Sequence, residues 1–109
     1  MASEVFGVSH TAGVTNSESV LINGVNGHTY VILSIMVCET AGAAETFDLY
    51  IDDGGGGTDY EIYSDQALAA NATFEHTSKL VIVDEDHLCA ATASAANVDI
   101  VVSYLDITR

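Results

Sequence analysis

Basic side chains are almost missing from this sequence of 109 residues, which has only Lys79 and Arg109 and also lacks proline and tryptophan. Against these two cations stand 16 Asp and Glu residues, giving a formal net charge of −14. Binding to a nucleic-acid backbone or to an anionic membrane depends on several Lys or Arg residues, so we expect neither partner. Disorder is not expected either, because 49 % of the residues are hydrophobic and only 17 % are charged.

Long apolar segments are also missing. The longest apolar run, residues 30–38, is far shorter than the about 20 residues of a membrane-spanning helix. Residues 1–4 lack the basic and apolar regions of a secretory signal, so we expect the chain to be made in a cytoplasm. Cys38 and Cys89 lie far apart without metal-finger spacing, which favours two free buried thiols; a disulfide between neighbouring strands is the alternative.

The hydrophobic pattern has a period of two, which is typical of β-strands. Apolar and polar residues alternate in residues 47–52 and 98–105, as in strands with one buried face. Residues 28–38 are almost continuously apolar, which suits a central strand covered on both faces, by the core and by a partner subunit. Turn signals separate six further short strands, at residues 4–9, 17–22, 60–64, 73–76, 79–83 and 87–92.

About nine short strands without a convincing helix predict an all-β protein. The pairs Asn23-Gly24 and Asn26-Gly27 tolerate positive φ and are expected to reverse the chain before the central strand. The regular spacing of strands and turns favours an antiparallel β-sandwich of the jelly-roll-like kind. We expect residues 16–109 to form this single domain, and residues 1–15 to be an N-terminal arm or an irregular edge strand.

A glycine-rich segment, residues 52–59, is the first candidate site. A phosphate-binding loop would be followed by a helix and a Lys, whereas a strand pattern follows here. Asp52, Asp53 and Asp59 surround the glycines, so a Ca²⁺ site is one interpretation, although the ligand alternation of an EF-hand loop is missing. A flexible, solvated hairpin tip is the interpretation that we favour.

Catalytic signals are weak throughout. His10, His28, His76 and His87 are scattered, and no Ser or Cys lies in a nucleophile-elbow context. The acidic segment 84–86 is typical of a solvated turn. We therefore predict a protein that is not an enzyme, with no catalytic, cofactor-binding or metal-binding residues and no cofactor.

Aromatic residues are the candidate contact residues. Tyr50, Tyr60 and Tyr63 lie around the glycine-rich segment, and Tyr50 shares a strand face with Asp48 and Asp52, away from the core. Exposed tyrosines serve as plain surface residues, as anchors of a protein interface or as platforms for a sugar ring. The self-repulsion of 14 net charges makes association an attractive source of stability for so small a domain. We predict an interface formed by Phe6, Tyr30, Tyr50, Tyr60, Tyr63 and Tyr104.

The order of strands and turns resembles small structural proteins of tailed bacteriophages. The resemblance runs through "NGVNGHTYVILSIMVCETAGAAETFDLYIDD", "YEIYSDQALAANATFEHTSKLVIVDEDHLCA" and "ANVDIVVSYLDI". It implies a virion protein, either a capsid decoration (cement) protein, often trimeric, or a tail component. Its partners would be further copies of itself and the major capsid protein or another virion protein.

What the resemblance implies about location is the outer surface of a phage head, after synthesis in the host cytoplasm. The strong acidity agrees with this, because packaged DNA would repel such a protein. The alternative function is a carbohydrate- or receptor-binding module of a phage tail or capsid surface. That module would use Tyr60, Tyr63 and the glycines of residues 54–57.

Overall fold

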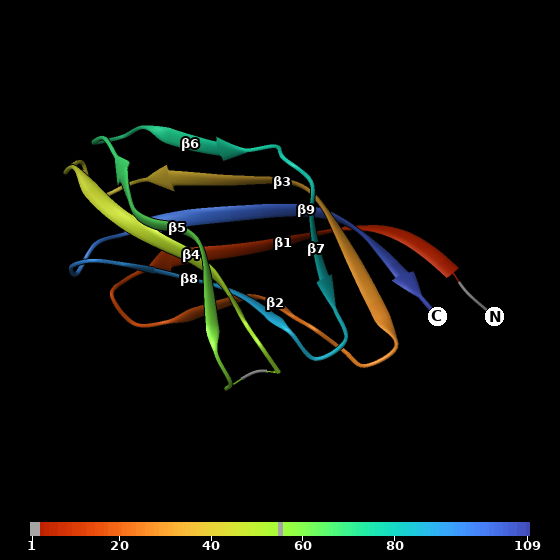
Figure 1. Cartoon of the computed structure of the whole chain (residues 1–109). Helices are drawn as coiled ribbons and strands as arrows, with labels where there is room; N and C mark the ends of the chain where they lie inside the picture. The colour runs from red at the N-terminus through yellow and green to blue at the C-terminus, as the bar shows by residue number, and fades with distance from the viewer. Residues whose placement is uncertain (1–2, 55) are drawn as a thin grey trace.

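Two antiparallel sheets lie face to face in the computed structural model, which describes residues 3–54 and 56–109 (Figure 1). The described residues form nine strands and no helix, and none of them belongs to a helix that could cross a membrane. In chain order the strands are β1 (Ser3–Val14), β2 (Ser19–Asn23), β3 (His28–Glu39), β4 (Glu45–Asp52), β5 (Asp59–Leu68), β6 (Thr73–His76), β7 (Leu80–Val83), β8 (His87–Thr92) and β9 (Val98–Thr108).

The chain passes several times between the two sheets. The first sheet, which we call sheet A, has the order β1-β9-β3-β6, and β7 also pairs with β3. The second, sheet B, has the order β2-β8-β4-β5. The short strands β6 and β7 pair in succession with the two halves of β3. The jelly-roll-like sandwich of about nine strands predicted from the sequence is confirmed.

The core lies between the sheets and is built from every second residue of the strands. Phe47 and Leu49 of β4 and Ile100 and Val102 of β9 are almost fully buried, as the alternation in their segments predicts. An aromatic cluster joins the sheets at one end: Phe74 of β6 makes edge contacts with Phe47 and with Tyr63 of β5, at ring-centroid distances of 5.3 and 4.9 Å. This cluster is the largest aromatic element of the core.

A β-bulge at Leu33 interrupts the alternation of β3. Ile32 pairs with Tyr104, and the next paired residue of β3 is Ser34, so Leu33 is the extra residue. Tyr30 and Ile32 therefore face the core before the bulge, and Ile35 and Val37 after it. The bulge lets one long strand keep its core face over its whole length.

Residues 1–15, expected to be an arm or an irregular edge strand, contain β1, the outermost strand of sheet A. This strand is longer than the predicted strand at residues 4–9. It pairs with β9 from Ser3 to Thr11; the register then shifts, and Val14 pairs with Val98. Met1 and Ala2 lie outside the described residues.

A buried carboxylate, that of Glu39, organises two connections between strands. It accepts hydrogen bonds from the backbone N–H groups of Ala41, Gly42 and Ala43 in the β3–β4 connection, at 2.8 to 3.1 Å. The N–H of Asn71, between β5 and β6, donates a further bond of 3.1 Å. These donors, that of Asn71 first, hold the pKa of Glu39 below its usual value.

Candidate functional site

The outer face of sheet A, which sheet B does not cover, is largely apolar. Register places Phe6 of β1 opposite Leu105 of β9, Leu105 opposite Val31 of β3, and Val31 opposite Val81 of β7. Residues directly opposite one another in a sheet share a face, so these four form one row across four strands, which we call the apolar row. Phe6 is 75 % exposed and Val81 is 50 % exposed.

Neighbouring rows extend the same surface. On one side, two rows away from the apolar row, register places Val101 opposite both His10 and Met36. On the other side, the adjacent row consists of Ile107, Thr29 and Val83. The bulged Leu33 is exposed as well. Carboxylates occur only at the margins of the described part of this face, where register places Glu4, Glu75 and Asp99.

The outer face of sheet B has the opposite character. Asp52 of β4 lies opposite Asp59 of β5 and opposite His87 of β8. Proximity to Asp48 and Asp59, together with burial, which is the larger effect, raises the pKa of Glu61 in β5. The molecule therefore presents one apolar face and one acidic face.

The predicted interface residues fall into three groups. Phe6 lies in the apolar row, and Tyr60 is 58 % exposed at the start of β5. Tyr30 and Tyr50 are buried within this chain. Tyr63 and Tyr104 are half-buried: Tyr63 belongs to the aromatic cluster, and the ring of Tyr104 covers Gly7, where a Cβ atom would overlap it. Phe6 and Tyr60 are thus the most exposed of the six predicted residues.

Sequence reasoning did not single out Val31, Val81 and Leu105 for the interface. The continuous apolar run of residues 28–38 was the available signal, because it predicts a strand covered on both faces. The structure shows that this chain covers one of the two faces of β3.

The glycine-rich tip is held by hydrogen bonds to carboxylates. Gly56 donates its N–H to the Oδ1 of Asp52 at 2.9 Å, and Gly54 donates to the Oδ1 of Asp86 at 3.2 Å. The N–H of Asp53 donates to the carbonyl of Thr58, which closes the hairpin. Gly55, part of the tip expected to be flexible, lies outside the described residues.

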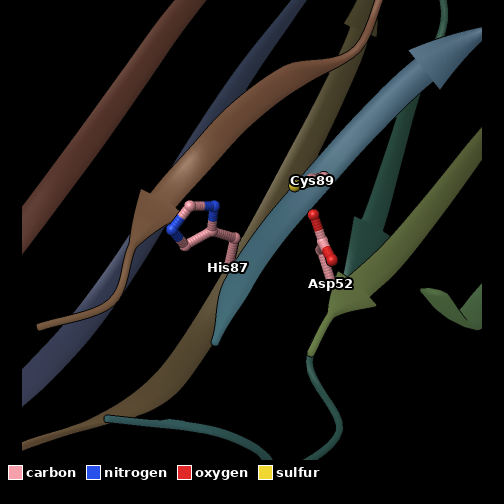
Figure 2. A group of neighbouring side chains, drawn as sticks. All are labelled: Asp52, His87 and Cys89. Atoms are coloured by element: carbon pink, nitrogen blue, oxygen red, sulfur yellow. The ribbon is translucent and has the colours of Figure 1, made fainter. Parts of the chain in front are cut away.

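Potential metal ligands converge beside this hairpin. One ligand atom each of Asp52, His87 and Cys89 lies within 4.8 Å of the other two, and Figure 2 shows the thiol of Cys89 beside the carboxylate of Asp52. Carboxylate oxygens of Glu18, Asp52 and Asp59 satisfy the same limit. Asp52 therefore belongs to both groups, and the five residues, Glu18, Asp52, Asp59, His87 and Cys89, are called the acidic cluster below.

Burial and negative charge determine the protonation of this cluster. Burial, with a smaller effect of Glu18, Asp52 and Asp59, raises the pKa of the Cys89 thiol to about 12. Although Asp59 is exposed, partial loss of water around its carboxyl raises its pKa, and the neighbouring Asp52 and Glu18 raise it further. The hydroxyl of Tyr50 donates to the carboxylate of Glu18, and burial and this bond raise the tyrosine's pKa. Each of these three groups is therefore harder to deprotonate than in water.

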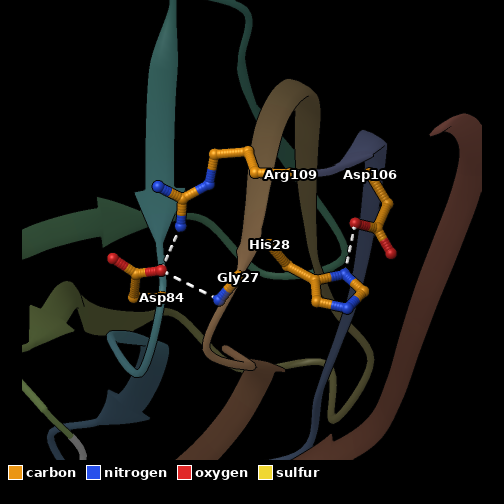
Figure 3. Close-up of polar contacts among 5 residues, drawn as sticks. All are labelled: Gly27, His28, Asp84, Asp106 and Arg109. Atoms are coloured by element: carbon orange, nitrogen blue, oxygen red, sulfur yellow. Dashed lines mark hydrogen bonds and ion pairs between the residues drawn. The ribbon is translucent and has the colours of Figure 1, made fainter. Parts of the chain in front are cut away.

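A separate set of polar contacts joins the ends of three strands (Figure 3). Asp84, in the β7–β8 turn, accepts hydrogen bonds from the guanidinium of Arg109 and from the N–H of Gly27, the latter at 3.0 Å. His28 Nδ1 lies 2.8 Å from the carboxylate of Asp106 in β9. These contacts fix the start of β3 against the end of β9.

The two cysteines are free, as the favoured interpretation of the sequence predicted. Cys38 lies in sheet A, opposite Thr73 and Asp99, whereas Cys89 lies in sheet B, opposite Val20 and Tyr50. The alternative, a disulfide between neighbouring strands, is therefore wrong within this chain.

Comparisons with known proteins identify similar folds only. The sequence matches no protein-family model and no curated protein. The structure is similar to a chain of the acidic stable capsid of Helicobacter pylori bacteriophage KHP30, with 10 % sequence identity, a TM-score of 0.59 and coverage of 98 % of this chain and 93 % of that one. A chain of the Bacillus endospore appendages, which are disulfide-linked pili, matches with 10 % identity, a TM-score of 0.58 and coverage of 98 % and 88 %. At these identities the similarity establishes a shared sandwich fold.

Proposed function

We propose that this chain is a non-enzymatic virion structural protein, a capsid decoration protein that assembles as a symmetric oligomer on the outer surface of a phage head and stabilises it. The observation that carries the proposal is the apolar row on the outer face of sheet A. Monomeric proteins seldom expose a continuous apolar surface of this kind unless a partner covers it. The partners are further copies of this chain and the major capsid protein or another virion protein.

The size of the face suits such a contact. Four strands about 4.8 Å apart, over about eight residues of 3.3 Å each, cover a footprint of roughly 500 Å². Stable interfaces bury about 800 Å² per partner, so the face provides the larger part of one interface. Its four apolar-row side chains would supply the desolvated centre that dominates interface energies.

The distribution of charge supports one orientation of the bound protein. The outer face of sheet B carries Asp48, Asp52, Asp59 and Glu61, whereas the apolar face has carboxylates only at its margins among the described residues. Docking through sheet A leaves the acidic face in solvent, where repulsion between carboxylates is weakest. In this orientation the acidic face points away from packaged DNA, which agrees with a position outside the shell.

The fold supports repeated assembly. The similar structures named above come from a phage capsid and from disulfide-linked pili. The resemblance of the sequence to phage structural proteins adds the decoration role and the trimer. We therefore take a homotrimer as the expected oligomer.

Light scattering during size-exclusion chromatography, at low and high salt, tests the assembly. We expect a mass of three 11.4 kDa chains that persists at high salt, because an apolar interface is not screened. Val81→Lys and Val101→Lys, on the apolar face, should each shift the mass to that of one chain.

Val25→Lys is the matched control, since Val25 is 51 % exposed against 50 % for Val81 but lies in the β2–β3 turn. It should keep the wild-type mass. A monomer in every buffer, or equal effects of Val25→Lys and Val81→Lys, would contradict assembly through this face. Circular dichroism of each variant shows whether the sandwich is retained.

Particles provide the test of location. In density-purified virions from the source of the sequence, we expect the chain to be present and an antibody against it to bind intact particles. Its absence from such particles would contradict the virion role even if the isolated chain is a trimer.

The second candidate, a carbohydrate- or receptor-binding module, is favoured by one observation, the exposure of Tyr60 beside the hairpin tip. Tyr63 is less available, because its hydroxyl bonds to His76 Nδ1 at 2.7 Å and its ring packs in the aromatic cluster. Binding to a glycan array that is lost in Tyr60→Ala but retained in Val81→Lys would support this candidate instead.

A further inference from the structure

We propose that the acidic cluster is a metal site in which Asp52, His87 and Cys89 bind a Zn²⁺ ion, with Glu18 and Asp59 as further carboxylate ligands. This site is independent of the assembly through sheet A. It lies on the other face of the molecule, where the end of β4, the start of β8 and the start of β5 meet.

Strand register assembles the three principal ligands. Asp52 is directly opposite His87, and Cys89 follows two residues later on the same strand, so all three side chains emerge on one face. Figure 2 shows the sulfur of Cys89 between the carboxylate of Asp52 and the imidazole of His87, which is turned away from Asp52. Their ligand atoms lie within 4.8 Å, and the ligands of a tetrahedral Zn²⁺ lie about 3.3–3.8 Å apart, so small side-chain rotations suffice.

The burial of a thiol without a hydrogen-bond partner, beside a carboxylate without a cation, is the second observation. Cys89 is fully buried, and its thiol makes no hydrogen bond among the described residues. Asp52 is only 6 % exposed, and its carboxylate accepts a hydrogen bond from the N–H of Gly56 but has no Lys or Arg beside it. Buried polar groups are normally satisfied, and a buried carboxylate normally has a cation beside it. The chain's two permanent cations lie elsewhere: Arg109 binds Asp84, and Lys79 precedes β7 in sheet A. A bound cation would give the thiol a partner and balance the charge of the carboxylate.

The donor types select the ion. Ca²⁺ and Mg²⁺ take oxygen ligands, whereas a thiolate and an imidazole together favour a softer divalent ion, of which Zn²⁺ is the usual occupant. Glu18 and Asp59 are exposed, and one carboxylate oxygen of each lies within 4.8 Å of the carboxylate of Asp52. They give the ion a negatively charged approach from solvent and complete the ligand set.

Binding would add a link between segments of sheet B. The ion would tie the residues before β2, through Glu18, to the hairpin between β4 and β5 and to β8. It would also neutralise part of the repulsion among three neighbouring carboxylates. We therefore expect the metal to raise the thermal midpoint of unfolding, since a ligand that binds only the folded state stabilises it.

Titration of the whole chain with Co²⁺, a spectroscopic substitute for Zn²⁺, tests the site. We expect one Co²⁺ per chain with a thiolate-to-metal charge-transfer band, displaced by Zn²⁺. Cys89→Ser should lose the band, and Asp52→Asn and His87→Gln should bind at least ten-fold more weakly. Zn²⁺ should raise the thermal midpoint of the wild type and not that of Cys89→Ser.

Cys38→Ser and His10→Gln are matched controls, since they remove the same chemistry from sheet A. Both should behave as the wild type, and circular dichroism before metal addition shows that each variant is folded. The proposal is overturned if wild-type protein gives no charge-transfer band, or if Cys89→Ser keeps it. It is also overturned if Ca²⁺ stabilises the wild type and Cys89→Ser as strongly as Zn²⁺ stabilises the wild type, because carboxylates alone would then explain the response.

Discussion

The aromatic cluster that joins the two sheets gives the sharpest stability prediction. Phe47 is almost fully buried, and a buried Phe removes roughly 150–250 Å² of apolar surface from water, worth about 4–6 kcal/mol at 25 cal/mol per Å². Because neighbours relax into part of the space, we expect Phe47→Ala to lower the free energy of unfolding by about 3–5 kcal/mol. Phe74 is half-buried, so Phe74→Ala should cost roughly half as much.

Ring geometry adds a coupling between these two residues. Their rings meet edge to face with centroids 5.3 Å apart, an arrangement worth about 0.5–1.5 kcal/mol beyond the buried area. In a double-mutant cycle, Phe47→Leu and Phe74→Leu together should therefore cost less than the sum of their separate costs by this amount. Leucine retains an apolar side chain, so the cycle isolates the ring contact.

Urea denaturation followed by circular dichroism measures these differences, with an unchanged dependence on urea as the sign that the transition stays two-state. Tyr60→Ala, at an exposed position, is the control and should change stability by less than about 0.5 kcal/mol. Strictly additive Leu variants, or a cost of Phe74→Ala that exceeds that of Phe47→Ala, would refute the description of the cluster as the link between the sheets.

Three further predictions follow from single contacts and from charge. Glu39→Gln should lower the free energy of unfolding at pH 7. The difference in this free energy from wild type should shrink below about pH 4, because a carboxyl with a lowered pKa loses its stabilising effect as it becomes protonated. Urea titrations at several pH values measure this difference. Gly24→Ala should cost about 1–3 kcal/mol, since its methyl group would overlap the backbone carbonyls of Asp84 and Asp86, and a wild-type thermal midpoint would contradict the contact. Added NaCl should raise the thermal midpoint in scanning fluorimetry, because salt screens the self-repulsion of the 14 net negative charges; a lower midpoint would contradict this.

The local pattern of the sequence predicts the strands well because each strand has one buried face. Alternation around Phe47 and Ile100 and the turn signals between segments identify the nine strands that the structure contains. The bulge at Leu33 is not predictable in this way, since it depends on how β3 and β9 pair.

The candidate sites were harder to predict than the strands. Asp52 and Cys89 are brought together by the register of β4 against β8, and a local pattern contains no register between distant strands. The apolar run that includes Val31 indicated two covered faces, but alternation does not distinguish a face covered by the same chain from one covered by another molecule.

The pairing of the first and last strands also affects how the protein is best handled. Ser3 lies opposite Thr108, so the start of β1 and the end of β9 lie at the same end of the molecule, as Figure 1 shows. A purification tag or fused domain attached before β1 or after β9 would therefore lie close to Phe6, beside the surface proposed to be covered. The connection of residues 93–97, at the other end of β9, is a better place for an epitope or fluorophore, because an insertion there leaves the apolar row accessible.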